Sequence, residues 1–197
     1  MKLLFASNNA HKLEEVRRIL APIEILGLAD IGCHTDIEEN GTTLEENSAI
    51  KAGFVYAWVQ RERPDMVYDG IIADDTGLEI EALGGQPGVY TARWAGEPAN
   101  DAANRQKALH ELQGKNNRNA QFRTVITWIS PKGEQKQVEG AVKGYMAEQE
   151  SGCKGFGYDS LFVPEGYDET FAQLPSECKN SISHRARALA NLKKILL

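Results

Sequence analysis

Two adjacent aspartates, Asp74 and Asp75, are the residues of this chain best suited to chemistry. Neighbouring carboxylates repel each other unless a proton or a cation lies between them. A hard cation such as Mg²⁺ binds carboxylate oxygens and keeps several waters, and a second carboxylate can activate one of those waters as a nucleophile. Asp, Thr and Gly also favour turns, so the run Asp74–Gly77 alone indicates a turn at least as strongly as a metal site.

The residues on either side of the aspartates predict two short strands. Ile71–Ala73 is apolar and β-branched and follows Gly70, as expected of a buried strand that ends at Asp74. Leu78–Ile80 reads as a second strand, before the glycine-rich run Gly84–Gly88. Carboxylates on a turn at a strand end lie where α/β proteins display their chemistry.

A polar loop near the N-terminus is a second candidate site. A predicted strand at residues 2–6 runs into Ser7-Asn8-Asn9-Ala10-His11-Lys12, and apolar residues from Leu13 to Leu20 recur at helical spacing. The loop therefore surrounds a helix N-terminus, whose free N–H groups favour phosphate. The alternative makes Asn9 a helix cap and Lys12 a solvated side chain.

A helix is predicted from Thr43 to about Glu62. Thr43 and Glu46 form a capping box, and Pro64 ends the pattern. The expected buried stripe leaves Lys51 outside it and consists of Ile50, Phe54, Ala57 and Trp58. Acids just upstream, such as Glu38 and Glu39, are often only favourable partners of the helix dipole.

The C-terminal part holds a glycine-rich loop, Gly152–Asp159, with two aromatic residues. Such a loop allows a flat ligand to approach and stack, although its aromatics can equally pack inward. Ser183 is predicted to cap a last helix with His184 and Arg185 in its first turn. Cations there oppose the helix dipole unless an acceptor faces them, and this local conflict indicates function. The remaining predicted elements are strands at 24–28, 122–129, 137–146 and 161–163 and a helix at 100–113.

Composition limits the class of protein. The 197 residues suffice for one large domain or two lobes sharing a core, and the net charge of −6 argues against a nucleic-acid binder. Three cysteines without CxxC spacing suit a reducing compartment. Without a signal peptide or a stretch of transmembrane length, the sequence predicts a soluble cytoplasmic protein and no membrane partner.

Five motifs in order along nearly the whole chain resemble those of the inosine triphosphate pyrophosphatases, which remove noncanonical purine nucleotides. The motifs are Ser7–Lys12, Glu46–Lys51, Ala73–Leu78 with Leu83–Tyr90, Gly155–Asp159, and Ser183–Arg185. The resemblance implies an α/β fold in a single domain, residues 1–197. Its central mixed β-sheet would be flanked by helices, with two lobes and an active-site cleft between them.

The resemblance also implies roles for individual residues. Asp75 is expected to be the general base and a Mg²⁺ ligand, together with Asp74 and Glu39. The triphosphate is expected to contact Lys51 and the first loop (Ser7, Asn8, Asn9, Ala10, His11 and Lys12). Thr76 is expected to contact the substrate, and the residues expected to surround the purine are Phe156, Gly157, Tyr158, Asp159, Lys179, His184 and Arg185. Asn8 stands where the family often has Gly, and Thr76 where it usually has Ser.

The expected reaction is Mg²⁺-dependent hydrolysis of ITP, dITP or XTP to the nucleoside monophosphate and pyrophosphate, by a homodimeric enzyme. Asp75 would activate water for in-line attack on the α-phosphorus, with Lys12 and Lys51 offsetting charge. Arg185 can only donate hydrogen bonds, so a 6-oxo purine suits it better than adenine by ~1–3 kcal/mol. Three alternatives remain: a related pyrophosphatase for modified pyrimidine or methylated nucleotides, a phosphatase that releases orthophosphate, and a non-catalytic nucleotide sensor.

Overall fold

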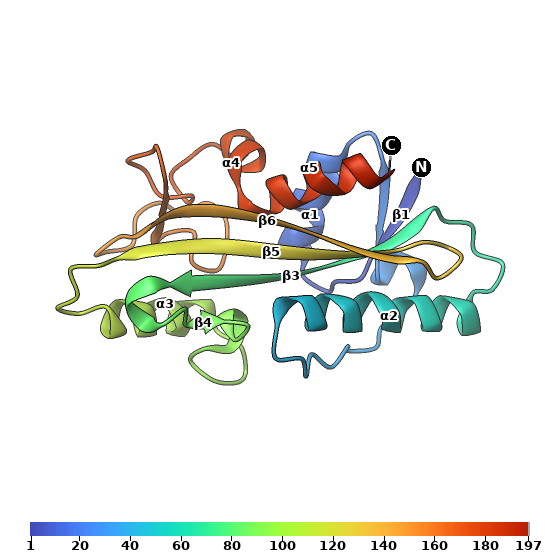
Figure 1. The fold of residues 1–197 in the computed structure, drawn as a ribbon, viewed down its shortest axis with the longest axis horizontal. Coiled ribbons are helices and arrows are strands. Elements are labelled where there is room, and N and C mark those ends of the chain that lie inside the picture. Colours follow the sequence, from blue (N-terminus) through green and yellow to red (C-terminus); the bar gives the residue numbers. More distant parts are fainter. Residues whose placement is uncertain (197) are drawn as a thin grey trace. The chain divides into compact units, whose positions relative to one another are not determined.

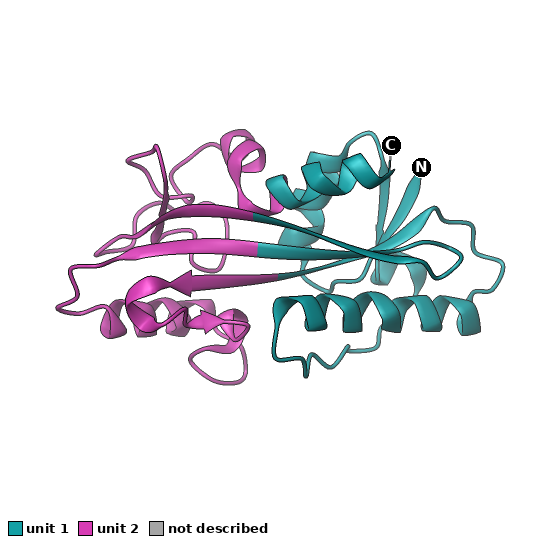
Figure 2. Cartoon of the chain, in the orientation of Figure 1, with its two compact units in different colours: residues 1–75, 124–140, 187–197 teal, residues 76–123, 141–186 magenta. Residues whose placement is uncertain are grey.

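The computed structural model describes residues 1–196, which divide into two compact units (Figure 2). Unit 1 contains residues 1–75, 124–140 and the C-terminal residues from Arg187, and unit 2 contains residues 76–123 and 141–186. Three long strands, β3 (Gly70–Ile80), β5 (Asn119–Ile129) and β6 (Gln135–Met146), contribute residues to both units. Each unit is therefore discontinuous in sequence.

The strands form one mixed sheet in the order β2-β1-β3-β5-β6-β7, with β4 paired to β3. β1 runs parallel to β2 and β3, whereas β4 is antiparallel to β3, and β6 and β7 are antiparallel to each other. The shorter strands are β1 (Lys2–Phe5), β2 (Glu24–Gly27), β4 (Pro87–Gly88) and β7 (Phe162–Pro164). The helices are α1 (Ala10–Leu20), α2 (Leu44–Glu62), α3 (Asp101–Glu111), α4 (Ser176–Ile182) and α5 (His184–Leu196), with 3₁₀ turns at Ala29–Ile31, Glu81–Leu83 and Thr91–Arg93. The predicted mixed sheet flanked by helices is confirmed.

In unit 1 both faces of the sheet are buried against helices. Alternate residues of each strand point to opposite faces, so each strand contributes apolar side chains to two separate clusters. Leu4 and Ile71 pack with Ala52 and Val55 of α2 in one hydrophobic cluster. Leu3, Phe5 and Ile72 pack in a second cluster with apolar residues of α1 and α5, including Val16 and Leu189. Figure 1 shows α2 on one side of the strands and α1 and α5 on the other.

Unit 2 has its own core, formed where β3, β5, β6 and β7 bring apolar residues together with α3. Leu78 and Ile80 of β3 cluster with Ala108 of α3, with its C-cap Leu112, and with buried residues that include the aromatic rings of Phe122, Phe162 and Phe171. The rings of Phe122 and Phe162 meet edge to face at 4.8 Å between centroids. Such a pair adds to the stabilisation that burial alone gives.

The prediction that Asp74 and Asp75 lie on a turn between two short strands is wrong. β3 is continuous from Gly70 to Ile80, and both aspartates lie inside it and are buried. Lysine partners, described below, stabilise both carboxylates in an extended chain, so tertiary contacts override the turn preference of the Asp-Asp-Thr-Gly run. The two carboxylates of β3 nevertheless lie just beyond the end of the neighbouring strand β1, because Phe5, the last residue of β1, pairs with Ile72.

The prediction for α2 is right about its ends and wrong about its buried face. Thr43 caps the helix by accepting a hydrogen bond from the N–H of Glu46 at 3.1 Å. The Glu46 carboxylate reaches back and accepts from the N–H of Thr42 at 2.6 Å, with a further backbone hydrogen bond from Thr43. Ala57 of the expected stripe is exposed and the other three are half-buried, whereas the buried residues are Leu44, Asn47, Ser48, Lys51, Ala52, Val55 and Val59.

The three cysteines are free thiols in the structure, as the sequence suggests: Cys33 is buried, Cys153 is exposed and Cys178 is half-buried. Across residues 1–196, no helix has both the length and the apolar character required to cross a membrane.

Two glycines give opposite predictions for stability. Gly53 lies inside α2 with open space around an added Cβ, so Gly53→Ala should raise the free energy of unfolding by about 0.5–1 kcal/mol, because alanine loses less backbone entropy. At Gly144 in β6 an added Cβ would lie 2.1 Å from the carbonyl oxygen of Val163, so Gly144→Ala should lower the free energy of unfolding by about 1–3 kcal/mol. Denaturant unfolding of both variants measures the difference, and equal effects contradict this packing.

Candidate active site

The N-terminal loop folds around the start of α1. Asn9 is the N-cap residue, and its side-chain oxygen accepts from the N–H of Lys12 at 3.1 Å. Ser7 Oγ accepts from the N–H of Asn9 at 3.2 Å. Asn8 Nδ2 lies 3.5 Å from Asp36 Oδ1, and Asn8, Ala10 and His11 are exposed. The loop is thus held by its own side chains beside a helix N-terminus.

Lys12 joins this loop to the first aspartate of β3. Its Nζ lies 3.1 Å from Asp74 Oδ1, and the Asp74 side chain is only 1% exposed. The position of Lys12 in the first turn of α1, directly after β1, brings its ammonium group to the neighbouring strand. Lys12 is therefore a partner of a buried carboxylate, and the alternative of a solvated side chain is wrong.

Lys51 bridges two further carboxylates. Its Nζ lies 2.8 Å from Glu39 Oε2 and 3.2 Å from Asp75 Oδ1. Because Lys51 is on the buried face of α2, it points at the strand that carries Asp75, and its own side chain is 8% exposed. Glu39 is thus the acid of its loop that reaches the cluster, whereas Glu38 is exposed. We call Lys12, Lys51, Glu39, Asp74 and Asp75 the acid–lysine cluster.

The charges of the cluster shift each other's pKa values. Burial pushes the pKa of Lys51 down, but the carboxylates of Asp75, Glu39 and Asp74 outweigh it, and the net pKa of Lys51 is raised. Lys51 therefore stays an ammonium ion. Burial also raises the pKa of Asp75, and the charges of Lys51 and Lys12 only partly oppose this. A carboxylate whose pKa is raised is a stronger base once ionised, as proton abstraction from water needs.

One atom of the cluster is left without a partner in the protein. Asp75 Oδ2 is buried and accepts no hydrogen bond. An ionised oxygen in this state is costly unless something else binds it, such as water, a metal ion or a ligand. Within residues 1–196 no three His, Cys, Asp or Glu residues are close enough to hold a metal ion by themselves. Any cation at Asp75 must therefore complete its coordination with water or ligand oxygens.

Unit 2 holds the second group of predicted residues, centred on the glycine-rich loop. Gly155 has φ +74°, and an added Cβ there would lie 2.0 Å from Asp159 Oδ2, so only glycine fits. The same carboxylate oxygen accepts from the N–H of Phe156 at 2.9 Å and from Lys179 Nζ at 2.6 Å. Asp159 thus closes the loop into a tight turn. Tyr158 packs inward, 3% exposed, and its hydroxyl donates to the carbonyl of Thr91 at 2.8 Å.

Lys179 comes from α4, a short helix that the sequence did not predict. Its side chain is 7% exposed and that of Asp159 is 6% exposed, so the ion pair is buried. Lys179 Nζ also lies 4.9 Å from the centre of the Phe156 ring, which the ring's negative face favours. The helix has seven residues, too few for a clear apolar periodicity, so only the resemblance singled out Lys179.

The contacts made in the first turn of α5 explain why the basic residues His184 and Arg185 stand at a helix N-terminus, where the helix dipole disfavours cations. Ser183 Oγ accepts from the N–H of Ala186 at 3.2 Å, as a cap should. Arg185 is 1% exposed, donates to Thr76 Oγ1 at 3.3 Å and lies 6.0 Å from the centre of the Phe156 ring. His184 is buried and stacks on Phe122 at 4.7 Å between ring centroids. These contacts offset the unfavourable position of the two side chains at a helix N-terminus.

The predicted site residues therefore fall into two groups, each inside one unit. Unit 1 holds Ser7, Asn8, Asn9, Ala10, His11, Lys12, Glu39, Lys51, Asp74 and Asp75, and unit 2 holds Thr76, Phe156, Gly157, Tyr158, Asp159, Lys179, His184 and Arg185. Sequence reasoning missed Thr91, whose hydroxyl accepts from the N–H of Leu78 at 2.8 Å and donates to the carbonyl of Gly88 at 2.6 Å. No sequence pattern marks such a contact between β3 and the loop that follows it.

Comparisons with known proteins agree with the resemblance. The model of the Ham1 family matches residues 3–195. A dITP/XTP pyrophosphatase of Flavobacterium johnsoniae is 46% identical over 197 residues, covering 100% of this chain and 98% of the relative. A protein of the same name from Bacillus subtilis is 46% identical, covering 98% of this chain and 96% of the relative.

Solved structures share the fold. The Ham1 protein of Staphylococcus aureus superimposes with a TM-score of 0.85 at 38% identity, covering 100% of this chain and 98% of that one. A nucleoside-triphosphatase / dITP/XTP pyrophosphatase from Mycobacterium abscessus gives a TM-score of 0.72 at 39% identity, with 98% of each chain covered. The fold class inferred from the resemblance is confirmed.

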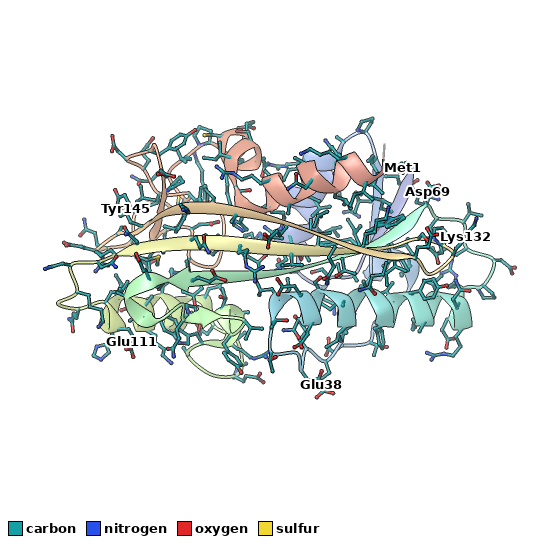
Figure 3. All side chains as sticks on the ribbon, viewed as in Figure 1. Met1, Glu38, Asp69, Glu111, Lys132 and Tyr145 are labelled. Atoms are coloured by element: carbon teal, nitrogen blue, oxygen red, sulfur yellow. The ribbon has the colours of Figure 1, made fainter. Side chains whose placement is uncertain are left out.

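Replacing Lys51, whose ammonium group bridges Glu39 and Asp75, should destabilise unit 1. In Lys51→Met, Glu39 and the buried Asp75 face each other without compensation, so the free energy of unfolding should fall by about 3 kcal/mol. The matched control is Lys132→Met, an exposed lysine at the β5–β6 turn (Figure 3), which should change it by less than about 0.5 kcal/mol. Denaturant unfolding compares the two, and equal stabilities contradict the bridging role of Lys51.

Proposed function

This chain belongs to the Ham1 family, and we propose that it hydrolyses dITP, XTP and ITP to the nucleoside monophosphate and pyrophosphate. The observation that carries the proposal is the acid–lysine cluster, in which buried Asp75 has one unpartnered oxygen and contacts Lys51, while its neighbour Asp74 contacts Lys12. The names of the two bacterial relatives support the substrate class. The physiological role is removal of deaminated purines from the nucleotide pool.

The triphosphate binds at the cluster and at the start of α1. Lys12 and Lys51 carry the charges that offset the phosphates, and the N–H groups of the first turn of α1 donate to phosphate oxygens. Ser7 and Asn9 keep the preceding loop in shape through the hydrogen bonds described above. Because both lysines already hold carboxylates, their positions are set before the substrate arrives.

The cluster also suits Mg²⁺, which in proteins usually takes one or two carboxylates and completes its shell with water and substrate phosphates. The unpartnered Asp75 Oδ2 suits one such carboxylate contact, and Glu39 or Asp74 would supply a second; water and phosphate oxygens would complete the shell, since no three acids of residues 1–196 are grouped closely enough to do so. When bound, Mg²⁺ supplies charge neutralisation on the phosphate oxygens.

Asp75 acts as the general base. Its carboxylate takes a proton from the water that attacks the α-phosphorus in line with the departing pyrophosphate. The pKa raised by burial makes this carboxylate a better proton acceptor than an exposed aspartate. Lys12 and Lys51 stabilise the negative charge that develops on the leaving group.

The purine is recognised by unit 2. The Phe156 ring offers a flat apolar face, and Arg185 offers only hydrogen-bond donors. A 6-oxo purine accepts from these donors, whereas the 6-amino group of adenine leaves a donor unpaired, at a cost of about 1–3 kcal/mol. Asp159 holds the backbone of Phe156, and Lys179, paired with Asp159, lies over the Phe156 ring.

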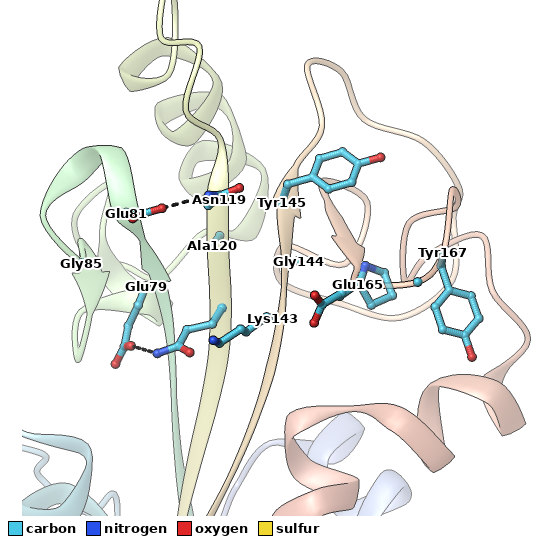
Figure 4. A pocket seen from close by; sticks show the side chains of 13 residues that line it. Glu79, Glu81, Gly85, Asn119, Ala120, Lys143, Gly144, Tyr145, Glu165 and Tyr167 are labelled. Carbon is cyan, nitrogen blue, oxygen red and sulfur yellow. Dashed lines mark hydrogen bonds between the residues drawn. The ribbon is translucent and has the colours of Figure 1, made fainter.

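Two further properties complete the proposal: a cytoplasmic location and a homodimer. The three free thiols suit a reducing compartment. A second copy of the chain docks on an exposed face of unit 2, where β3, β5, β6 and β7 surround a groove of about 750 Å³ (Figure 4). The groove is lined by acids and a base, Glu79, Glu165 and Lys143, and by the exposed residues Tyr145 and Tyr167. Mixed charge on one surface allows a two-fold pairing of acid with base.

Product analysis tests the reaction. With dITP or XTP and Mg²⁺, the native chain should release pyrophosphate and the monophosphate, and ATP and dTTP should react much more slowly. Asp75→Asn should lower kcat by about a thousandfold, because it removes the general base. Glu38→Gln, at an exposed acid of the neighbouring loop, is the control and should keep native activity. Release of orthophosphate as the first product, or full activity of Asp75→Asn, refutes the proposal.

Sedimentation equilibrium tests the dimer. The native chain should sediment as a dimer, and Tyr145→Asp should shift it toward monomer, because the change puts an unpaired charge into the proposed contact. Glu111→Lys, an exposed change at the end of α3, should leave the dimer intact. A native chain that is monomeric at micromolar concentration rules out this contact.

A further inference from the structure

Two side chains of α3 hold both backbone polar groups of Gly157, its N–H and its carbonyl. Asp101 Oδ2 accepts from the Gly157 N–H at 2.9 Å, and Arg105 Nη1 donates to the Gly157 carbonyl at 3.0 Å. Asp101 and Arg105 are four residues apart, so they lie on the same face of the helix. Neither was singled out in the sequence, because an Asp and an Arg at this spacing on a helix normally indicate only a surface ion pair.

Arg105 is itself fixed by the ends of the same loop. Its Nε donates to Glu150 Oε2 at 2.8 Å, and that carboxylate also accepts from Ser160 Oγ at 2.9 Å. These residues line a hollow of about 150 Å³ behind the glycine-rich loop. The guanidinium group therefore makes two contacts at a fixed angle, as its planar fork allows.

Gly157 is the residue of this loop at which fixing the backbone should most affect the orientation of the Phe156 ring. It lies between Phe156, whose ring faces Lys179 and Arg185, and Tyr158, which is anchored in the core. Gly157 has φ +61° and nothing within 4 Å of an added Cβ, so its backbone, not its packing, requires glycine. A glycine with no side chain packed around it changes its backbone angles easily, and such a change here would turn the Phe156 ring. The hydrogen bonds from α3 oppose that rotation.

We infer that Asp101 and Arg105 are positioning residues for purine recognition, which fix the Gly157 peptide and thereby the face that Phe156 presents to the base. The inference rests on the proposed function, in which Phe156 contacts the purine. Neither residue touches the substrate, and neither belongs to the acid–lysine cluster. Their loss should weaken binding of the base and leave the hydrolytic step nearly unchanged.

Steady-state kinetics with dITP and dATP test whether Asp101 and Arg105 affect binding of the base and not the hydrolytic step. Arg105→Ala and Asp101→Ala should each raise KM for dITP by about tenfold with kcat within about twofold of native, because the lost contact serves substrate binding. The preference for dITP over dATP should also fall by about tenfold. Asp101→Asn keeps an oxygen that can accept from the Gly157 N–H and should restore most of the affinity. Gln106→Ala, at an exposed neighbour on the same helix, is the matched control and should behave as native.

Hydrogen exchange supplies a readout that does not depend on turnover. The Gly157 amide should exchange faster in Asp101→Ala than in Asp101→Asn or Gln106→Ala. If Arg105→Ala fails to fold, Arg105→Lys keeps the charge but cannot reach both Glu150 and Gly157, and should raise KM in the same direction.

Phe156→Ala separates failure of the inference from failure of the proposed site. If Phe156→Ala raises KM while the two α3 variants leave KM, selectivity and Gly157 exchange unchanged, the positioning role is wrong and the base site stands. If Phe156→Ala itself leaves KM and selectivity unchanged, both the base site and the positioning role are wrong.

Discussion

The acid–lysine cluster is the constraint on which unit 1 depends. Two adjacent aspartates inside a buried strand are unfavourable, because burial raises the pKa of Asp75 and each carboxylate repels the other. Lys12 and Lys51 make the arrangement stable, since each brings an ammonium group within 3.2 Å of one aspartate. Neither lysine could do so from an arbitrary place in the chain.

This requirement determines where two helices begin. β1 ends at Phe5, level with Ile72, and the loop capped by Asn9 starts α1 so that Lys12 reaches Asp74. Thr43 starts α2 on the other face of the sheet, and Lys51 then lies on its buried side among Ser48, Ala52 and Val55. The caps therefore serve more than helix stability, because they set the positions of the two cations.

Local chemistry made much of the fold predictable. The caps Asn9, Thr43 and Asn100 and the β5–β6 hairpin follow from side chains and turn residues close in sequence. The failures came where distant residues decide. The turn propensity of Asp, Thr and Gly predicted a loop at the centre of β3, which is a strand. Hydrophobic periodicity predicted that Lys51 lies outside the buried face of α2, because periodicity counts every lysine as solvated. The candidate site residues gathered into two groups, but only motif resemblance, not periodicity, singled out Lys179 on the short α4.

The charge of the cluster bears on how an acidic protein can bind a polyanion. Within the acid–lysine cluster the three carboxylates outnumber the two ammonium groups, so with all five ionised the site carries a net negative charge. A triphosphate would be repelled by such a site at short range. Adding a divalent cation reverses the sign, whereas protonating Asp75 reaches only neutrality and removes the base. Under the proposed function, substrate and metal would therefore bind together, and the lysines would keep the carboxylates in place beforehand and offset phosphate charge afterwards.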